Sequence, residues 1–221
     1  MNTILIIVIA ITCITSYIGF QKPELFQKYK FEVGAIQRRK EYIRLISAGF
    51  LHADFMHLFF NMLTLYFFAP IAIMGFGVSG FLIIYLASIV LGNLFCLYVY
   101  KNVPFYSAIG ASGGVSGVLF AAVALAPKEI EVNFLPGYLF GALYFGYSVY
   151  MMLNPRMNDN IGHAAHLGGA FFGLVYAVAI YPEFAIQNAL YLGIMSLPLI
   201  YLAYQIFAVS YTHLTLPTKR I

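Results

Sequence analysis

Long apolar stretches make up most of this 221-residue chain, and short polar or glycine- and proline-containing breaks separate them. A transmembrane helix needs about 20 mostly apolar residues, with a range of roughly 17–25. Six of the stretches fall in this range, and one is slightly shorter. The pattern therefore predicts an all-α, polytopic transmembrane helix bundle with helices over residues 4–20, 55–74, 81–100, 112–126, 134–153, 163–181 and 189–209.

Composition supports a membrane domain and excludes a soluble one. Hydrophobic residues are 62% of the chain and charged residues only 9%, whereas a soluble domain carries roughly 25% charged residues. Residues 1–209 are therefore expected to form one membrane domain, with no separate soluble unit. The composition changes abruptly at residue 210, and we expect residues 210–221 (SYTHLTLPTKRI) to be a non-native or disordered tail outside any site.

The fourth apolar stretch is too short to cross a bilayer. Its 15 residues would form a helix of about 22 Å, against a hydrocarbon core of about 30 Å. Glycines gather at its start, at Gly110, Gly113 and Gly114. Irregular backbone at membrane depth is tolerated only where protein buries it or water reaches it. This predicts that the helix starts at Ser112 beside a wet cavity.

Few polar side chains lie inside the apolar stretches, so each is a functional candidate. His57 and Asn61 lie four residues apart on one helical face, Ser112 opens the fourth stretch, and His163 and His166 open the sixth. A serine nucleophile needs an adjacent base, and these stretches contain no Asp or Glu, which favours a Ser–His dyad. The developing oxyanion could be bound by His57, Asn61 and the Ser112 backbone N–H.

Glycine spacing predicts that the helices carrying the serine and the histidine touch. Gly113 and Gly117 lie four residues apart in the fourth stretch, as do Gly169 and Gly173 in the sixth. Small residues at this spacing let helix backbones approach closely in a membrane. We assign these four glycines, together with Gly110, to helix packing.

Three segments together resemble the signature motifs of the rhomboid intramembrane serine proteases. They are HLFFN (57–61), GASG (110–113) and AHLGGAFFG (165–173), in the family's order and about fifty residues apart, and the resemblance covers residues 42–181. It implies a six-helix core plus a seventh helix, with Ser112 as nucleophile, His166 as base, and His57 and Asn61 at the oxyanion site. It also implies cleavage of transmembrane segments of membrane-protein substrates, without a cofactor or metal. The chain has no Trp, and Ile43-Arg44 stands where rhomboids often have Trp-Arg.

Several alternatives remain open from the sequence. GVSG (114–117) also fits the GxSG pattern, but its Ser116 lies a turn inside the helix, so Ser112 is preferred. A metal site of His57, His163 and His166 is disfavoured because HExxH is missing. A catalytically silent, rhomboid-like protein that binds or escorts membrane proteins is the leading rival. A transporter would require a second broken helix.

Charge distribution bears on membrane orientation. Seven of the twelve Lys and Arg lie in residues 22–44, and the positive-inside rule would place this loop in the cytoplasm. Rhomboids usually have their first loop on the other side, and we follow the resemblance. We expect a multi-pass protein of the bacterial cytoplasmic membrane whose partners are the lipid bilayer and membrane-protein substrates, with no nucleic acid.

Overall fold

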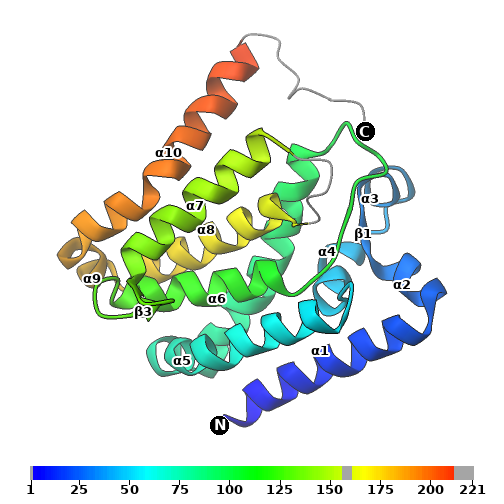
Figure 1. The fold of residues 1–221 in the computed structure, drawn as a ribbon, viewed down its shortest axis with the longest axis horizontal. Helices are drawn as coiled ribbons and strands as arrows, with labels where there is room; N and C mark the ends of the chain where they lie inside the picture. Colours follow the sequence, from blue (N-terminus) through cyan, green and yellow to red (C-terminus); the bar gives the residue numbers. More distant parts are fainter. Residues whose placement is uncertain (1, 156–160, 212–221) are drawn as a thin grey trace.

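The computed structural model describes residues 2–155 and 161–211, and its long elements are all helices. They form one bundle, in which α1 lies along one outer side and α10 along the other (Figure 1). The predicted all-α bundle is confirmed. The long helices are α1 (Thr3–Gln21), α5 (Phe55–Val99), α6 (Ser112–Leu125), α7 (Gly137–Leu153), α8 (His163–Ile180) and α10 (Ala189–Tyr211).

Helix α5 contains the predicted second and third helices. Its 45 residues are interrupted at Gly77, where φ is +70° and ψ is 175°. Glycine has no Cβ and adopts positive φ without the penalty that other residues incur. The chain therefore leaves the helical conformation within the predicted break at residues 75–80 and starts a second helical arm.

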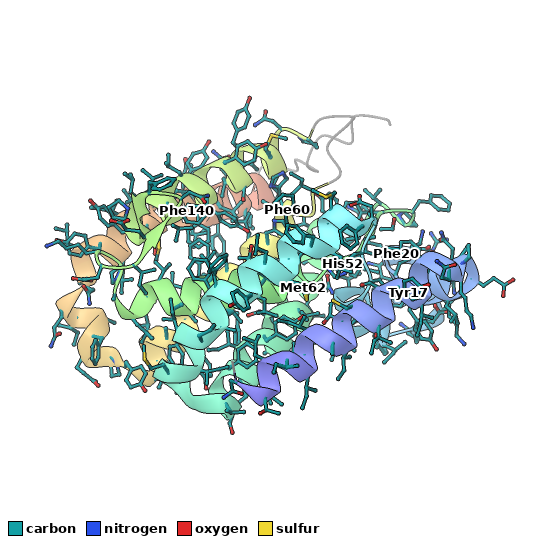
Figure 2. The ribbon with its side chains drawn as sticks, turned by 60° about the horizontal axis from the view of Figure 1, so that its bottom comes forward. Tyr17, Phe20, His52, Phe60, Met62 and Phe140 are labelled. Atoms are coloured by element: carbon teal, nitrogen blue, oxygen red, sulfur yellow. The ribbon has the colours of Figure 1, made fainter. Side chains whose placement is uncertain are left out.

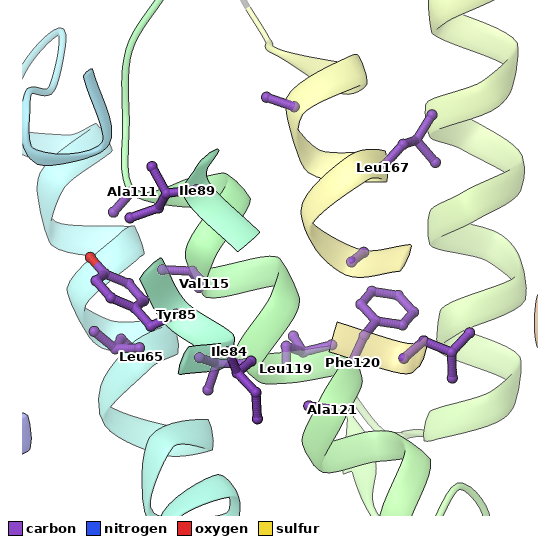
Figure 3. Packing of buried hydrophobic residues seen from close by; sticks show 14 of the residues in the cluster. Leu65, Ile84, Tyr85, Ile89, Ala111, Val115, Leu119, Phe120, Ala121 and Leu167 are labelled. Atoms are coloured by element: carbon purple, nitrogen blue, oxygen red, sulfur yellow. The ribbon is translucent and has the colours of Figure 1, made fainter. Parts of the chain in front are cut away.

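Helix α6 lies at the centre of the bundle. It has 14 residues, all of residues 113–124 are buried, and it packs chiefly against α5 and α8. Figure 3 shows apolar side chains of α6, among them Val115 and Leu119, packed beside Tyr85 and Ile84 of α5. In the described part of the chain, α1, α5, α8 and α10 are long and apolar enough to span a membrane, whereas α6 is shorter. Surrounding protein thus shields this short helix from lipid.

The long first connection folds onto the segment that precedes α6. Its strand β1 (Phe31–Glu32) pairs antiparallel with β2 (Ser107–Ala108). Arg44 is only 4% exposed and donates to the carbonyls of Gln27 and Lys30 and to the Glu41 carboxylate. Hydrogen bonds from Arg39 and Arg44 lower the pKa of Glu41 to about 2. The elements of this connection are α2 (Pro23–Tyr29), β1 (Phe31–Glu32), α3 (Val33–Arg39), α4 (Arg44–Ser47) and a 3-10 turn, η1 (Ala48–Phe50).

The helix boundaries predicted at residues 134 and 209 differ from the structure. The helix predicted from residue 134 begins at Gly137, because β3 (Glu131–Val132) and β4 (Leu135–Pro136) form a small hairpin first. Asn133 and Phe134 have positive φ, the conformation of a two-residue hairpin turn. Beyond α8, α9 (Pro182–Gln187) precedes α10. Helix α10 continues through Ser210 to Tyr211, and the rest of the predicted tail, residues 212–221, lies outside the described residues.

Candidate active site

Ser112 and His166 meet where α6 and α8 begin. Ser112 is the first residue of α6, and His166 lies in the first turn of α8. Ser112 Oγ is 2.6 Å from His166 Nε2, a hydrogen-bond distance between residues 54 positions apart in sequence. The two side chains that the sequence singled out as a dyad therefore have the contact that proton transfer requires.

The glycine pairs lie at the contact between α6 and α8. A Cβ on Gly169 would overlap the carbonyl oxygen of Gly113, and a Cβ on Gly173 would overlap that of Gly117. A Cβ on Gly117 would overlap the Ser88 hydroxyl of α5. Any larger residue at these positions would push the helices apart and separate Ser112 from the helix that carries His166.

Gly110 does not lie in a helix contact, where we expected it from the sequence. It lies outside α6, two residues before Ser112, with φ +120°. A Cβ there would be 2.8 Å from His57 Nε2 and 3.6 Å from Ser112 Oγ. The missing side chain therefore leaves space between the histidine of α5 and the serine of α6, in a backbone conformation that favours glycine.

His57 and Asn61 lie one turn apart at the start of α5, and the His57 ring lies against Gly110. The His57 backbone N–H donates to Asp54 Oδ1 at 2.8 Å, which caps the helix. The Ala53 N–H points at His57 Nδ1 at 3.5 Å, so His57 Nε2 faces Gly110. Asn61 donates from Nδ2 to the His57 carbonyl at 2.9 Å within its own helix. An amide carries two N–H groups, so this bond uses one of them.

A small cavity of about 10 Å³ lies against Ser112, which is enough for about one water molecule. Its lining comes from η1, the second arm of α5, the segment before α6, and the start of α8: Ala48, Ile89, Asn93, Ala108, Ile109, Gly110, Ser112, Gly113, Gly162 and Ala165. A larger cavity of about 810 Å³ lies between α1, α2 and the start of α5, where Tyr17, Phe26 and Leu58 contribute to the wall. We regard the smaller cavity as the one relevant to Ser112, because the larger one is lined by other residues.

Tyr144 of α7 is a site residue that sequence reasoning missed. Its ring lies nearly parallel to the His166 imidazole, with 6.4 Å between centroids and 22° between planes. Its hydroxyl is 2.7 Å from Ser116 Oγ. The two GxSG serines thus have different partners, with Ser112 on His166 and Ser116 on Tyr144. Nothing in the sequence distinguishes this tyrosine among 18.

A second Ser–His contact involves His52, in the connection before α5. The structure buries His52 completely. Its Nδ1 is 2.8 Å from Ser16 Oγ of α1, and its Nε2 accepts from the Ala111 N–H at 3.2 Å. Burial lowers the pKa of His52 to about 3.

The described residues contain no group of three or more His, Cys, Asp and Glu side chains arranged to hold a metal ion. His163 does lie near His166, with 6.3 Å between ring centroids, and its ring meets that of Tyr147 at 5.5 Å. His163 is 5% exposed at the start of α8. These contacts fit a packed histidine beside the dyad.

Known proteins resemble this chain over its central region. The family model for the Rhomboid domain matches residues 39–183. The chain is 31% identical over 135 residues to "Putative rhomboid protease YdcA" of Bacillus subtilis, covering 61% of this chain and 65% of that protein. It is 30% identical over 141 residues to "Rhomboid protein 1, mitochondrial" of Saccharomyces cerevisiae, covering 61% and 40%. It is 31% identical over 141 residues to the human "Presenilin-associated rhomboid-like protein, mitochondrial", covering 60% and 36%.

The chain spans less than two thirds of the length of these curated relatives. The match nevertheless includes all three motifs, at 57–61, 110–113 and 165–173, and more than half of the chain. Its apolar helices make it an integral membrane protein. On this evidence, the chain belongs to the rhomboid family.

Proposed function

We propose that this protein is an intramembrane serine endopeptidase that cleaves transmembrane segments of membrane-protein substrates. The observation that carries the proposal is the 2.6 Å contact between Ser112 Oγ and His166 Nε2 inside a bundle of apolar helices. Its relatives include a protein named as a rhomboid protease and others named only as rhomboid-like. Retention of both side chains favours the protease over the silent binding protein.

The dyad would act by nucleophilic catalysis. His166 Nε2 takes the hydroxyl proton while Ser112 Oγ bonds to the carbonyl carbon of the scissile peptide, giving a tetrahedral oxyanion. His166 then donates that proton to the departing amine as the C–N bond breaks, which leaves an acyl ester on Ser112. A water molecule, deprotonated by His166, hydrolyses the ester and restores the serine.

The space beside Gly110 is the proposed oxyanion site. His57 Nε2 borders it, and with Nδ1 facing the Ala53 N–H, the tautomer protonated on Nε2 can donate into it. The Ser112 N–H is among the first amides of α6, which have no partner within the helix. The remaining amide hydrogen of Asn61 would be a third donor. Such donors are aimed at charge that develops only in the transition state.

The stacked ring of Tyr144 lies beside the His166 imidazole. Two aromatic rings that pack nearly parallel restrict each other's rotation, and the hydroxyl bond to Ser116 fixes the tyrosine in turn. We assign Tyr144 the role of holding the imidazole so that its Nε2 faces Ser112.

Labelling with a fluorophosphonate tests the proposal without requiring the natural substrate. The reagent bonds its phosphorus to an activated serine Oγ and releases fluoride, and mass spectrometry identifies the labelled residue. We expect a single label on Ser112, lost in Ser112→Ala and His166→Ala and retained in Ser116→Ala. Labelling of Ser116, or a folded wild type that does not react, would overturn the assignment, and the latter would favour the silent binding protein.

The membrane that holds the protein is a separate question. Its relatives include a Bacillus subtilis protein and several named as mitochondrial. We propose the bacterial cytoplasmic membrane, and fractionation of the source organism would test this.

A further inference from the structure

Three buried groups connect helix α1 to the residue that precedes Ser112. They are the Ser16 hydroxyl on α1, the His52 imidazole in the connection before α5, and the backbone of Ala111. All three residues are 0% exposed. Figure 2 shows His52 between α1 and the first arm of α5.

The donor and acceptor of each hydrogen bond in this series can be assigned, starting from the Ala111 backbone. The Ala111 backbone N–H can only donate, so His52 Nε2 must accept. A neutral imidazole with an accepting Nε2 carries its proton on Nδ1, which therefore donates to Ser16 Oγ. The Ser16 hydroxyl in turn donates to the Phe50 carbonyl at 3.0 Å. Burial lowers the pKa of His52 to about 3, so the imidazole stays neutral at physiological pH. Its Nε2 therefore remains able to accept the hydrogen bond from the Ala111 N–H.

These directions exclude Ser16–His52 as a second catalytic pair. In a catalytic dyad the serine hydroxyl donates to the histidine, which then removes that proton. Here the imidazole donates to the serine, and its other nitrogen is occupied by Ala111. Complete burial also keeps a peptide carbonyl from reaching Ser16.

This series of hydrogen bonds reaches the backbone directly before the proposed nucleophile, Ser112. Ala111 is the N-cap residue of α6, directly before Ser112. The preceding Gly110 N–H donates to the Ala48 carbonyl at 3.0 Å. Residues 110 and 111 are thus each held by one hydrogen bond to the segment 48–52. The His52 ring also meets the His57 ring edge-on, with 4.9 Å between centroids.

We infer that His52 is a positioning residue that fixes the backbone before Ser112 and the His57 ring relative to each other, and that Ser16 on α1 holds His52 in place. The inference rests on the proposed protease function. It makes α1 a functional part of the site, although α1 lies outside the residues 39–183 that match the family.

The test compares three variants with one control in the full chain. Ser16→Ala removes the support of His52, His52→Ala removes both bonds, and His52→Gln keeps a side-chain oxygen that can accept from the Ala111 N–H. Thr12→Ala is the matched control, because Thr12 is equally buried on α1 and donates to Val8 of its own helix. For each protein we would measure the second-order rate of fluorophosphonate labelling and the hydrogen exchange of the peptide that carries Ala111.

We expect His52→Ala to label Ser112 roughly 10- to 100-fold more slowly, the loss that a misplacement of about 1 Å can cause. Ser16→Ala should lose less, His52→Gln should recover part of the rate, and Thr12→Ala should match wild type. With a peptide substrate, kcat should fall while KM stays unchanged, because His52 contacts no substrate. Exchange at Ala111 should accelerate in His52→Ala and Ser16→Ala but not in Thr12→Ala.

Each outcome bears on one of the two claims. A wild-type protein that does not label contradicts the protease function, while the exchange of Ala111 still reports whether His52 holds that amide. Wild-type labelling together with unchanged rates in Ser16→Ala and His52→Gln contradicts positioning, even if His52→Ala does not fold. Unchanged exchange at Ala111 in Ser16→Ala and in folded His52→Ala or His52→Gln also contradicts it.

Discussion

Gly169→Ala perturbs the helix contact on which the dyad depends. A Cβ at this position would overlap the Gly113 carbonyl oxygen and lie 2.7 Å from its carbonyl carbon and 3.0 Å from its Cα. Non-bonded carbons pack at about 3.5–4.0 Å. Helix α8 must therefore move away from α6 by about 0.5–1 Å to accept one methyl group.

The displacement reaches the proposed active site because His166 lies on α8 one turn before Gly169. The 2.6 Å contact between His166 Nε2 and Ser112 Oγ would lengthen to the limit of a productive hydrogen bond, about 3.2 Å, or beyond it. We expect the labelling rate of Ser112 to fall by about 10- to 100-fold. Overpacking of this kind also costs about 1–3 kcal/mol of stability.

Two matched substitutions make this measurement specific. Gly193→Ala on α10 should leave the labelling rate unchanged and should not lower the melting temperature, because nothing lies within 4 Å of a Cβ there and Ala is the better helix former. Gly113→Ala should have an intermediate effect, because its Cβ would lie 3.3 Å from the Ala165 carbonyl oxygen. A Gly169→Ala protein that labels and melts like wild type would refute the reasoning.

The remaining predictions use the rate of substrate cleavage. Ser112→Ala and His166→Ala should each abolish it, and the double variant should be no worse, because a dyad acts as a unit; a markedly worse double variant would contradict the dyad. Tyr144→Phe keeps the stacked ring but loses the hydroxyl bond to Ser116, so it should retain far more activity than Tyr144→Ala, and equal losses would contradict a role for the ring. Asn61→Ala should slow cleavage by about 10²–10³ through loss of one oxyanion donor, and an unchanged rate would remove Asn61 from that role.

The helices and the Ser112–His166 contact could be predicted because their signals are local or repeated. Apolar runs of membrane length mark the helices, and four-residue glycine spacing on two helices predicts the backbone contact that the structure has at Gly113 and Gly169. The limits of an apolar run predict the limits of the helix less well. Phe134 is apolar, yet it lies in a hairpin turn with positive φ, so the apolar run begins before the true helix start at Gly137.

His52 and Tyr144 could not be predicted because their partners come from distant parts of the chain. His52 lies 36 residues from Ser16 and 59 from Ala111, and no spacing rule connects them. A histidine in a polar connection normally faces water, and here contacts with Ser16, the Ala111 backbone and the His57 ring accompany its complete burial. The position of Gly110 beside His57 could not be predicted either, because the two residues are far apart in sequence and glycine has no side chain to indicate a contact.

The most direct test of the central claim is cleavage in a bilayer. Purified wild-type protein and Ser112→Ala would each be reconstituted into liposomes with a labelled single-pass membrane protein, and the products would be sequenced. The proposed mechanism predicts cleavage by wild type within or beside the transmembrane segment, and none by Ser112→Ala. Equal cleavage by both proteins would contradict it, because the activity would then not depend on the serine that contacts His166.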